Sequence, residues 1–320
     1  MFTPISTVTV FAPATVANVA CGYDILGLAI NAPGDEITVS LNRSGEITIT
    51  EIRGDEGKLP LDPKVNSVTV AAQALWESCK EQYSDSWDNF GAEFIIDKKM
   101  PFGSGMGSSA ASAVAGAYAA NAILGSPLTK REVLPFAMLG EQAADGSYHA
   151  DNVAPSLFGG ISLVRSNQEL DIIELPVPQD LWVTVVHPKI EILTKDARDI
   201  LPKQVELGSA SRQLGHLGGF IASLYTNDMA LMQRSLQDEW IAPHRSQLIP
   251  AFSELQQAVM EQGALGFNIS GAGPSVFALS QSQPQAQAIA DSISSIWSDF
   301  NPSVYISTVN LDGAKVLSSK

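Results

Sequence analysis

Residues 100–124 read MPFGSGMGSSAASAVAGAYAANAIL, a glycine-rich loop that continues directly into a segment of mostly small residues. The glycines Gly103, Gly105 and Gly107 allow the backbone to turn tightly and to approach a ligand closely. The small-residue segment is predicted to be a helix, whose first turn presents unpaired N–H groups and the positive end of its dipole. The two serines that follow Gly107 add hydroxyls suited to phosphate oxygens or to a bridging Mg²⁺. The stretch therefore predicts an anion site at the start of a helix.

Other interpretations of this loop compete with that one. The Walker A pattern does not fit, because Ser108 and Ser109 follow Gly107 where a Lys and then a Ser or Thr are required. A dinucleotide fingerprint is nominally present as Gly105-x-Gly107-x-x-Ala110, but a second helix follows where a strand ending in an acidic residue is needed. The plainest alternative is a glycine-rich turn with a small-residue helix packed tightly under a sheet.

The chain around this loop is predicted to mix strands and helices. Strands are expected at 8–11, 37–41 and 46–52, the last two joined as a hairpin across 42–45, and near 93–96. Helical spacing of apolar residues predicts a helix over 66–83. Thr129 and Glu132 form a capping-box pattern at the head of a helix that ends near Gly146. Residues 147–160 are expected to form a loop that leads to a strand at 161–164.

The second half alternates between strands and helices. Strands are expected at 182–187, 266–270, 276–280 and 303–309, and helices at 203–225, in a pair reaching 262, and at 285–297. The order β-α-β-β-α-β with an extra helical insertion favours a ferredoxin-like sandwich. The boundary between the two halves is expected near residues 165–180, where Pro176 and Pro178 lie.

Length, charge and cysteine content limit the possible classes. A chain of 320 residues predicts two packed units of similar size. The net charge of −15 argues against wide contact with nucleic acid or anionic membranes. The first residues lack the features of a signal peptide, and no apolar run reaches membrane-spanning length. Cys21 and Cys79 are too few for a disulfide framework, so a cytoplasmic protein is expected.

Three segments together resemble the GHMP kinases, a family of small-molecule kinases whose glycine-rich loop wraps the phosphates of ATP. PFGSGMGSSAASAVAG at 101–116 resembles the central motif of the family. APATVANVACGYDILGLAI at 12–30 resembles its amino-terminal motif, and NISGAGPSVFAL at 268–279 resembles its glycine-rich carboxy-terminal motif. The three segments span almost the whole chain.

This resemblance implies a fold, a nucleotide site and an assembly. The implied fold is α+β and GHMP kinase-like, with a ribosomal S5 domain 2-like ATP-binding domain over residues 1–170 and a ferredoxin-like domain over 171–320. Mg²⁺ is expected between Ser109 and Glu141, and a homodimer is implied. The expected ATP contacts are Pro101, Phe102, Gly103, Ser104, Gly105, Met106, Gly107, Ser108, Ser109, Ala110 and Ala111.

Within the family, four further segments resemble the members that phosphorylate L-homoserine. They are ANVACGYD at 17–24, HADNVAP at 149–155, TKDAR at 194–198 and PHR at 243–245. Homoserine carries an ammonium, a carboxylate and a hydroxyl, so its pocket needs an acid, one or two arginines and a polar partner. The expected substrate residues are Asn18, Asp24, His149, Asn152, Arg198 and Arg245. Asp24 suits the ammonium, and the two arginines suit the carboxylate. For each residue alone, a solvated charge or a turn residue is the alternative.

The residue that receives the hydroxyl proton is left open. Several relatives in the family use an aspartate, whereas the members that phosphorylate homoserine carry an asparagine, here Asn152. Asp151 directly precedes it, so a shift of one residue exchanges a neutral amide for a base. Phosphoryl transfer proceeds without a strong base, because positioning and charge neutralisation dominate its catalysis. The expected catalytic set is Asn152, Glu141, Ser109 and Thr194.

The resemblance implies phosphorylation of L-homoserine by ATP, a step toward threonine. One alternative is a GHMP kinase that acts on another small alcohol. A second is a kinase-like sensor that has kept the nucleotide loop and lost turnover, although Ser108, Ser109 and Glu141 argue against it.

Overall fold

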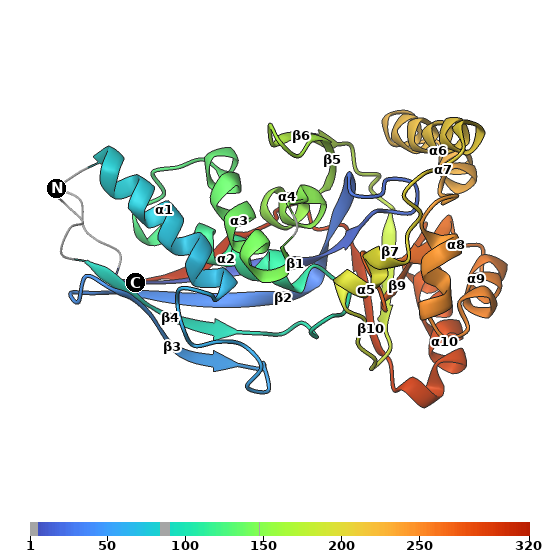
Figure 1. Ribbon diagram of the computed structural model, residues 1–320. Coiled ribbons are helices and arrows are strands. Elements are labelled where there is room, and N and C mark those ends of the chain that lie inside the picture. Colours follow the sequence, from blue (N-terminus) through green and yellow to red (C-terminus); the bar gives the residue numbers. More distant parts are fainter. Residues whose placement is uncertain (1–5, 84–89, 147) are drawn as a thin grey trace.

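The computed structural model describes residues 6–83, 90–146 and 148–320, without the side chains of residues 82, 83, 145 and 194. Figure 1 shows a helix-covered sheet at one end and a smaller sheet with its own helices at the other. The strands of the first part are β1 (Thr7–Ala17), β2 (Leu26–Asn42), β3 (Ile47–Arg53), β4 (Gly91–Asp97), β5 (Ile161–Ser166) and β6 (Asp171–Leu175). Its helices are α1 (Ser67–Tyr83), α2 (Ser108–Ile123), α3 (Lys130–Asp145) and α4 (Ala150–Phe158).

The rest of the chain forms most of the second part of the molecule. The second sheet has the strands β7 (Trp182–His187), β8 (Gly266–Ile269), β9 (Val276–Ser280) and β10 (Ser303–Thr308), whereas β11 (Lys315–Ser319) belongs to the first sheet. The helices of this second part are α5 (Thr194–Asp199), α6 (Leu207–Thr226), α7 (Met229–Ser235), α8 (Ala242–Arg245), α9 (Phe252–Glu261) and α10 (Gln283–Ile296).

The second sheet confirms the expected ferredoxin-like sandwich. Among the described residues it has four strands in the order β10-β7-β9-β8, all antiparallel to their neighbours. Apolar strand residues pack against α9 and α10 in a cluster that includes the fully buried Val276, Ile293 and Trp297. The insertion after β7, from α5 to α8, brings Arg198 and Arg245 to the border between the two parts.

The first sheet differs from the expected hairpin. β4 lies between β2 and β3, antiparallel to β2 and parallel to β3, so residues 46–52 do not pair with 37–41. A parallel pair needs a crossover, and α1 supplies it while packing against α2 and α3. The chain does reverse its direction between β2 and β3, but packing of α1 against α2 and α3 places β4 between these two strands.

Helix α2 lies at the centre of the first part, and most of its residues are fully buried. Small side chains allow this, because the helix contacts β1, β2, α1, α3 and α4. A Cβ on Gly116 would lie 2.1 Å from the Val68 carbonyl oxygen of α1. The small-residue segment after the loop is therefore a helix that is packed on all sides.

One further expectation about the elements is corrected. The predicted loop at 147–160 contains helix α4, whose Val153, Ala154 and Leu157 are fully buried; Ser147 lies outside the described residues. Pro155 and the glycines at 159 and 160 are typical of loops, so the helical spacing of the nearby apolar residues did not predict a helix. The division into domains at 170/171 stays a prediction; the β5–β6 hairpin spans residues 170 and 171, and the chain leaves the first sheet after Leu175, within the expected range of 165–180. The last strand, β11, returns to pair with β1 in the first sheet.

Candidate active site

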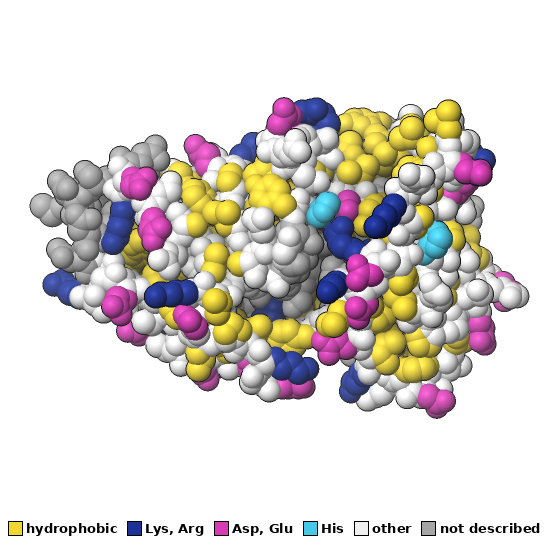
Figure 2. Space-filling model, in the orientation of Figure 1, with side chains coloured by type: hydrophobic (Ala, Val, Ile, Leu, Met, Phe, Trp, Pro, Cys, Tyr) yellow, Lys and Arg dark blue, Asp and Glu magenta, His cyan; other side chains and the backbone are white. Residues whose placement is uncertain are grey.

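A cleft of about 290 Å³ lies where the two parts of the molecule meet. Residues that line it come from the glycine-rich loop, from the starts of α2 and α4, from the end of α3, and from the 17–24 and 271–272 segments. Arg198 and Arg245 of the insertion also line it. Figure 2 shows basic, acidic and histidine side chains gathered near the middle of the visible face, where the two parts join.

The glycine-rich loop is held in a conformation that only glycine adopts without strain. Gly103, Gly105 and Gly107 have φ angles of 56°, 74° and 66°. A Cβ on Gly107 would lie 2.1 Å from Thr15 Oγ1, and a Cβ on Gly105 would lie 2.3 Å from the Ser270 carbonyl oxygen. Gly107 is the N-cap of α2 and offers no side chain to its first-turn N–H groups. Those groups are therefore available for an anion.

A second glycine-rich loop, residues 270–275, packs on the first. The Ser270 hydroxyl donates to the Gly105 carbonyl oxygen at 2.7 Å, and the Ser275 N–H donates to the Ser104 carbonyl oxygen at 3.2 Å. The Gly271 carbonyl oxygen accepts from Asn18 Nδ2 and from an Arg245 nitrogen, both at 3.0 Å. The loop thus ties the anion site to the insertion.

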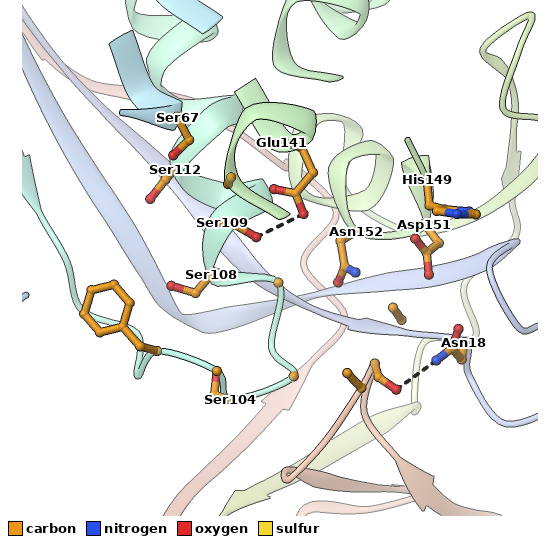
Figure 3. A pocket seen from close by; sticks show the side chains of 18 of the residues that line it. Asn18, Ser67, Ser104, Ser108, Ser109, Ser112, Glu141, His149, Asp151 and Asn152 are labelled. Carbon is orange, nitrogen blue, oxygen red and sulfur yellow. Dashed lines mark hydrogen bonds between the residues drawn. The ribbon is translucent and has the colours of Figure 1, made fainter. Parts of the chain in front are cut away.

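Ser109 and Glu141 meet beside the helix start (Figure 3). The Ser109 hydroxyl donates to Glu141 Oε1 at 3.0 Å, and Glu141 is 6% exposed. The predicted Thr129–Glu132 capping box is confirmed and starts the helix that carries Glu141. Among the residues described, no group of three or more His, Cys, Asp or Glu side chains forms a metal cage. One carboxylate with a hydroxyl fits Mg²⁺ that completes its shell with phosphate oxygens and water.

Asp24 and Arg198 face each other across the other end of the cleft. Two Arg198 nitrogens donate to the two Asp24 carboxylate oxygens at 3.2 and 3.3 Å, and Arg198 also reaches the Tyr23 hydroxyl at 3.4 Å. His149 Nδ1 lies 3.5 Å from Asp24 Oδ2. A fork of opposite charges in a partly buried cleft is suited to a zwitterion.

Arg245 lies deeper than Arg198. It is 3% exposed, its Nε donates to the Ala197 carbonyl oxygen at 2.9 Å, and its guanidinium lies 5.4 Å from the centre of the Tyr23 ring. Burial lowers the pKa of Arg245 from its ordinary value. The side chain is held in place, and its positive charge is directed at the cleft.

The 18–24 segment is strained. Asn18, Val19, Ala20 and Asp24 have φ angles of 70°, 39°, 58° and 59°, which non-glycine residues adopt rarely. The Asp24 N–H donates to Asn18 Oδ1 at 3.0 Å, which closes the segment on itself. Such strain is concentrated at functional sites, and it supports the interpretation of Asn18 and Asp24 as site residues rather than ordinary turn residues.

Asp151 and Asn152 both lie at the start of α4 and line the cleft (Figure 3). The Thr15 hydroxyl donates to Asn152 Oδ1 at 2.6 Å, which leaves the Asn152 amide N–H groups for the cleft. Burial, and next the nearby Asp24 charge, raise the pKa of Asp151 to about 7. The two neighbours therefore offer a donor and a carboxyl that titrates near neutrality.

Most, but not all, of the predicted residues line the cleft. Phe102, Gly103, Ser104, Gly105, Gly107, Ser108 and Ser109 do, together with Asn18, Asp24, Glu141, His149, Asn152, Arg198 and Arg245. Met106, Ala110 and Ala111 are buried behind the loop, and Pro101 precedes it without lining the cleft. The Thr194 side chain lies outside the described residues.

Sequence reasoning missed other lining residues, among them Lys98, Leu59, Ser67 and Ser112. Lys98 lies close to the glycine-rich loop in the sequence. Two adjacent lysines are usually exposed to solvent, however, so the Lys98–Lys99 pair does not by itself indicate a site residue. Tyr23 was also missed as the ring beneath Arg245.

Comparison with known proteins gives one family at both ends of the chain. Residues 66–160 match the model of the GHMP kinases N terminal domain, and residues 220–299 match that of the GHMP kinases C terminal domain. A homoserine kinase of Chlorobaculum tepidum is 43% identical, over 98% of this chain and 99% of that protein. The crystal structure of homoserine kinase from Cytophaga hutchinsonii superposes with a TM-score of 0.94 at 48% identity, covering 99% of both chains.

Proposed function

Because the chain belongs to the GHMP kinase family, we propose that it transfers the γ-phosphoryl group of ATP to the hydroxyl of L-homoserine. The products are ADP and O-phospho-L-homoserine, and the step leads toward threonine. The observation that carries the proposal is one cleft that joins an uncapped helix start to the Asp24–Arg198–Arg245 group. The identity of the relatives supports the choice of amino alcohol.

The acceptor is held by its two charged groups. Asp24 accepts from the ammonium, and Arg198 and Arg245 pair with the carboxylate. In the structure Asp24 and Arg198 neutralise each other, so an incoming zwitterion exchanges one ion pair for two. Uncharged sugars have neither an ammonium nor a carboxylate. Their binding would leave the charges of Asp24 and the two arginines without an oppositely charged group on the acceptor.

The nucleotide is held by the glycine-rich loop. The first-turn N–H groups of α2 and the hydroxyls of Ser108 and Ser109 contact the phosphates, and the 270–275 loop fixes the backbone from behind. Ser109 and Glu141 would hold Mg²⁺. When bound, that ion neutralises charge on the phosphate oxygens during transfer.

Asn152 positions the acceptor hydroxyl. Its oxygen accepts from Thr15, so its amide N–H groups are directed at the cleft. A neutral amide is too weak a base to take the hydroxyl proton. The loose transition state of phosphoryl transfer does not demand a strong base. Asp151 is the second candidate, favoured by its pKa of about 7 and its place beside Asn152. A kcat that falls below pH 7 and loses that dependence in Asp151→Asn identifies Asp151 as the proton acceptor.

A coupled assay of ADP release tests the activity with homoserine, serine, mevalonate and galactose as acceptors. We expect the highest kcat/KM for homoserine, and a preference for any other alcohol contradicts the choice of substrate. A protein that binds ATP and homoserine but releases no ADP is a sensor, the second class of function.

Location and assembly remain predictions. No helix in the described ranges is both long and apolar enough to cross a membrane. We propose a cytoplasmic homodimer on the family resemblance, and sedimentation of the purified protein tests the assembly.

A further inference from the structure

A buried ion pair lies under the anion site. Lys98 directly follows β4, and Asp35 lies on β2 beside it, since the strands align Glu36 with Asp97. Asp35 pairs with Lys98 through Oδ2, and the side chains are 0% and 2% exposed. Burying two charges is costly, and an apolar pair of similar volume is often as stable. Fold stability alone therefore does not explain why a lysine and an aspartate occupy this position.

The Lys98 ammonium is directed at the first turn of α2. Nζ donates to the Ser108 carbonyl oxygen at 3.0 Å, to the Ser108 hydroxyl at 2.7 Å and to the Ser112 hydroxyl at 2.7 Å. The Ser112 hydroxyl donates in turn to Asp35 Oδ2 at 2.8 Å, and Asp35 Oδ1 accepts from the Lys99 N–H at 3.0 Å. The helix start is thus anchored to two strands of the sheet.

The sign of this charge is unusual for its place. The start of a helix is its positive end, so a cation there is unfavourable unless an anion is close. Asp35 offsets part of the cost from behind the helix. On the cleft side, Lys98 and the free N–H groups of α2 add their positive fields at the point where the phosphates are expected.

We propose that Lys98, held by Asp35, is a positioning residue for the nucleotide phosphates, an inference that rests on the proposed kinase function. The side chain fixes the Ser108 hydroxyl and the first turn of α2, and it raises the positive potential of the loop. Its three N–H groups already face four acceptors, so it acts through Ser108 rather than as a direct phosphate ligand.

The test measures ATP affinity by titration calorimetry in the presence of Mg²⁺, with no acceptor added. Lys98→Met is expected to weaken ATP binding roughly tenfold or more, as the loss of charge-assisted hydrogen bonds predicts. The KM for homoserine is expected to stay within about twofold. Lys99→Met is the matched control, because that neighbouring lysine is 42% exposed and pairs with surface carboxylates. Its ATP affinity is expected to equal that of the unmodified protein.

Removing Lys98 alone leaves the buried Asp35 carboxylate without its cation. If thermal unfolding shows that Lys98→Met is not folded, Asp35→Asn with Lys98→Met removes both charges and takes its place. An unchanged ATP dissociation constant in whichever variant folds overturns the proposal.

A double-mutant cycle with Ser108→Ala separates positioning from direct contact. If Lys98 acts through Ser108, the two substitutions together weaken ATP binding by clearly less than the product of their separate effects. Fully multiplicative effects contradict the proposed route. Because the readout is ATP binding, a protein that binds ATP but phosphorylates no amino alcohol refutes the proposed reaction while leaving this result valid.

Discussion

At the scale of single residues, the cleft is organised by charges that face one another before any ligand is present. Asp24 and Arg198 form a fork that is partly open to solvent, and Arg245 lies behind it against Tyr23. The two arginines therefore have different tasks. Arg198 is free to change partner, whereas Arg245 is fixed by two backbone carbonyl oxygens.

Arg198→Gln is expected to raise the KM for homoserine roughly 10- to 100-fold, since a charged contact with the carboxylate is lost. The KM for ATP should stay within about twofold, because Arg198 does not touch the glycine-rich loop. Steady-state kinetics with each substrate varied in turn measure both values. Arg212→Gln is the control, because this exposed arginine of α6 pairs with Glu239. Equal effects of the two substitutions contradict the role of Arg198.

Glu141→Gln is expected to lower kcat by about tenfold or more and to raise the Mg²⁺ concentration needed for half-maximal rate. The amide keeps the shape of the side chain but removes the charge that a divalent cation needs. A magnesium titration of the initial rate measures the shift. Glu254→Gln, on the exposed face of α9, should titrate like the unmodified protein. A normal magnesium requirement for Glu141→Gln excludes it as a ligand.

Asp151 should make stability depend on pH. Its folded pKa of about 7 lies above the ordinary value of 3.8, so the folded state keeps a proton that the unfolded chain releases between these values. Stability therefore falls as pH rises through that window and levels off above about pH 7. Asp151→Asn removes this loss. The free energy of unfolding of the variant, relative to that of the unmodified protein, should therefore grow by at most about 1.4 kcal/mol for each unit by which the pH rises. Urea unfolding at pH 5, 6, 7 and 8 measures this difference in free energy of unfolding, and a difference that does not change with pH refutes the raised pKa of Asp151.

At the scale of elements, the site is built by two glycine-rich loops pressed together. Gly105 lies against the backbone of Ser270 and Gly273, so the loop before α2 and the loop between β8 and β9 form one unit. Each loop could be identified from its own sequence. Their contact spans 165 residues of chain, so no local pattern predicts it.

Gly105→Ala is expected to cost several kcal/mol of stability and to abolish ATP binding, since the new Cβ would meet the Ser270 carbonyl oxygen at 2.3 Å. Gly146→Ala is the matched control. Gly146 also has a positive φ, 76°, but ends α3 with open space around it. It should cost only about 1 kcal/mol and leave ATP affinity unchanged. Denaturant unfolding and titration calorimetry with ATP compare the two variants. Equal losses of stability and of ATP affinity show that the contact between the two loops is unimportant.

At the scale of the whole molecule, the two parts are joined more closely than their order along the chain suggests. β11 completes the first sheet beside β1, with Lys320 and Thr7 exchanging backbone hydrogen bonds. The carboxy-terminal strand thus stabilises the amino-terminal sheet, which a division at residue 170 does not anticipate.

Deleting residues 315–320 is expected to lower the free energy of unfolding by roughly 2 to 5 kcal/mol, because β1 loses one of its two neighbouring strands and exposes apolar area. Thermal and urea unfolding measure the loss. Leu317→Ser keeps the strand and changes only a half-exposed side chain, so its effect should stay within about 0.5 kcal/mol. If the deletion is as mild as the substitution, β11 does not support the sheet.

Elements with local signals could be predicted from the amino-acid sequence alone. The loop at 103–107, the small-residue helix α2, the capping box at Thr129 and the ferredoxin-like order of the second sheet follow from turn chemistry, spacing and side-chain size. Those signals act over a few residues, so they can be read without knowing the fold.

Features that depend on residues far apart in the chain could not be predicted in this way. Burial of α1 places β4 between β2 and β3, and packing of Val153 and Leu157 turns an apparent loop into α4. Lys98 is important because Asp35, 63 residues away, and Ser108 surround its ammonium, which no pattern in a KK pair reveals. Free energy from burial and from paired charges depends on what is near in space, and sequence spacing does not encode it.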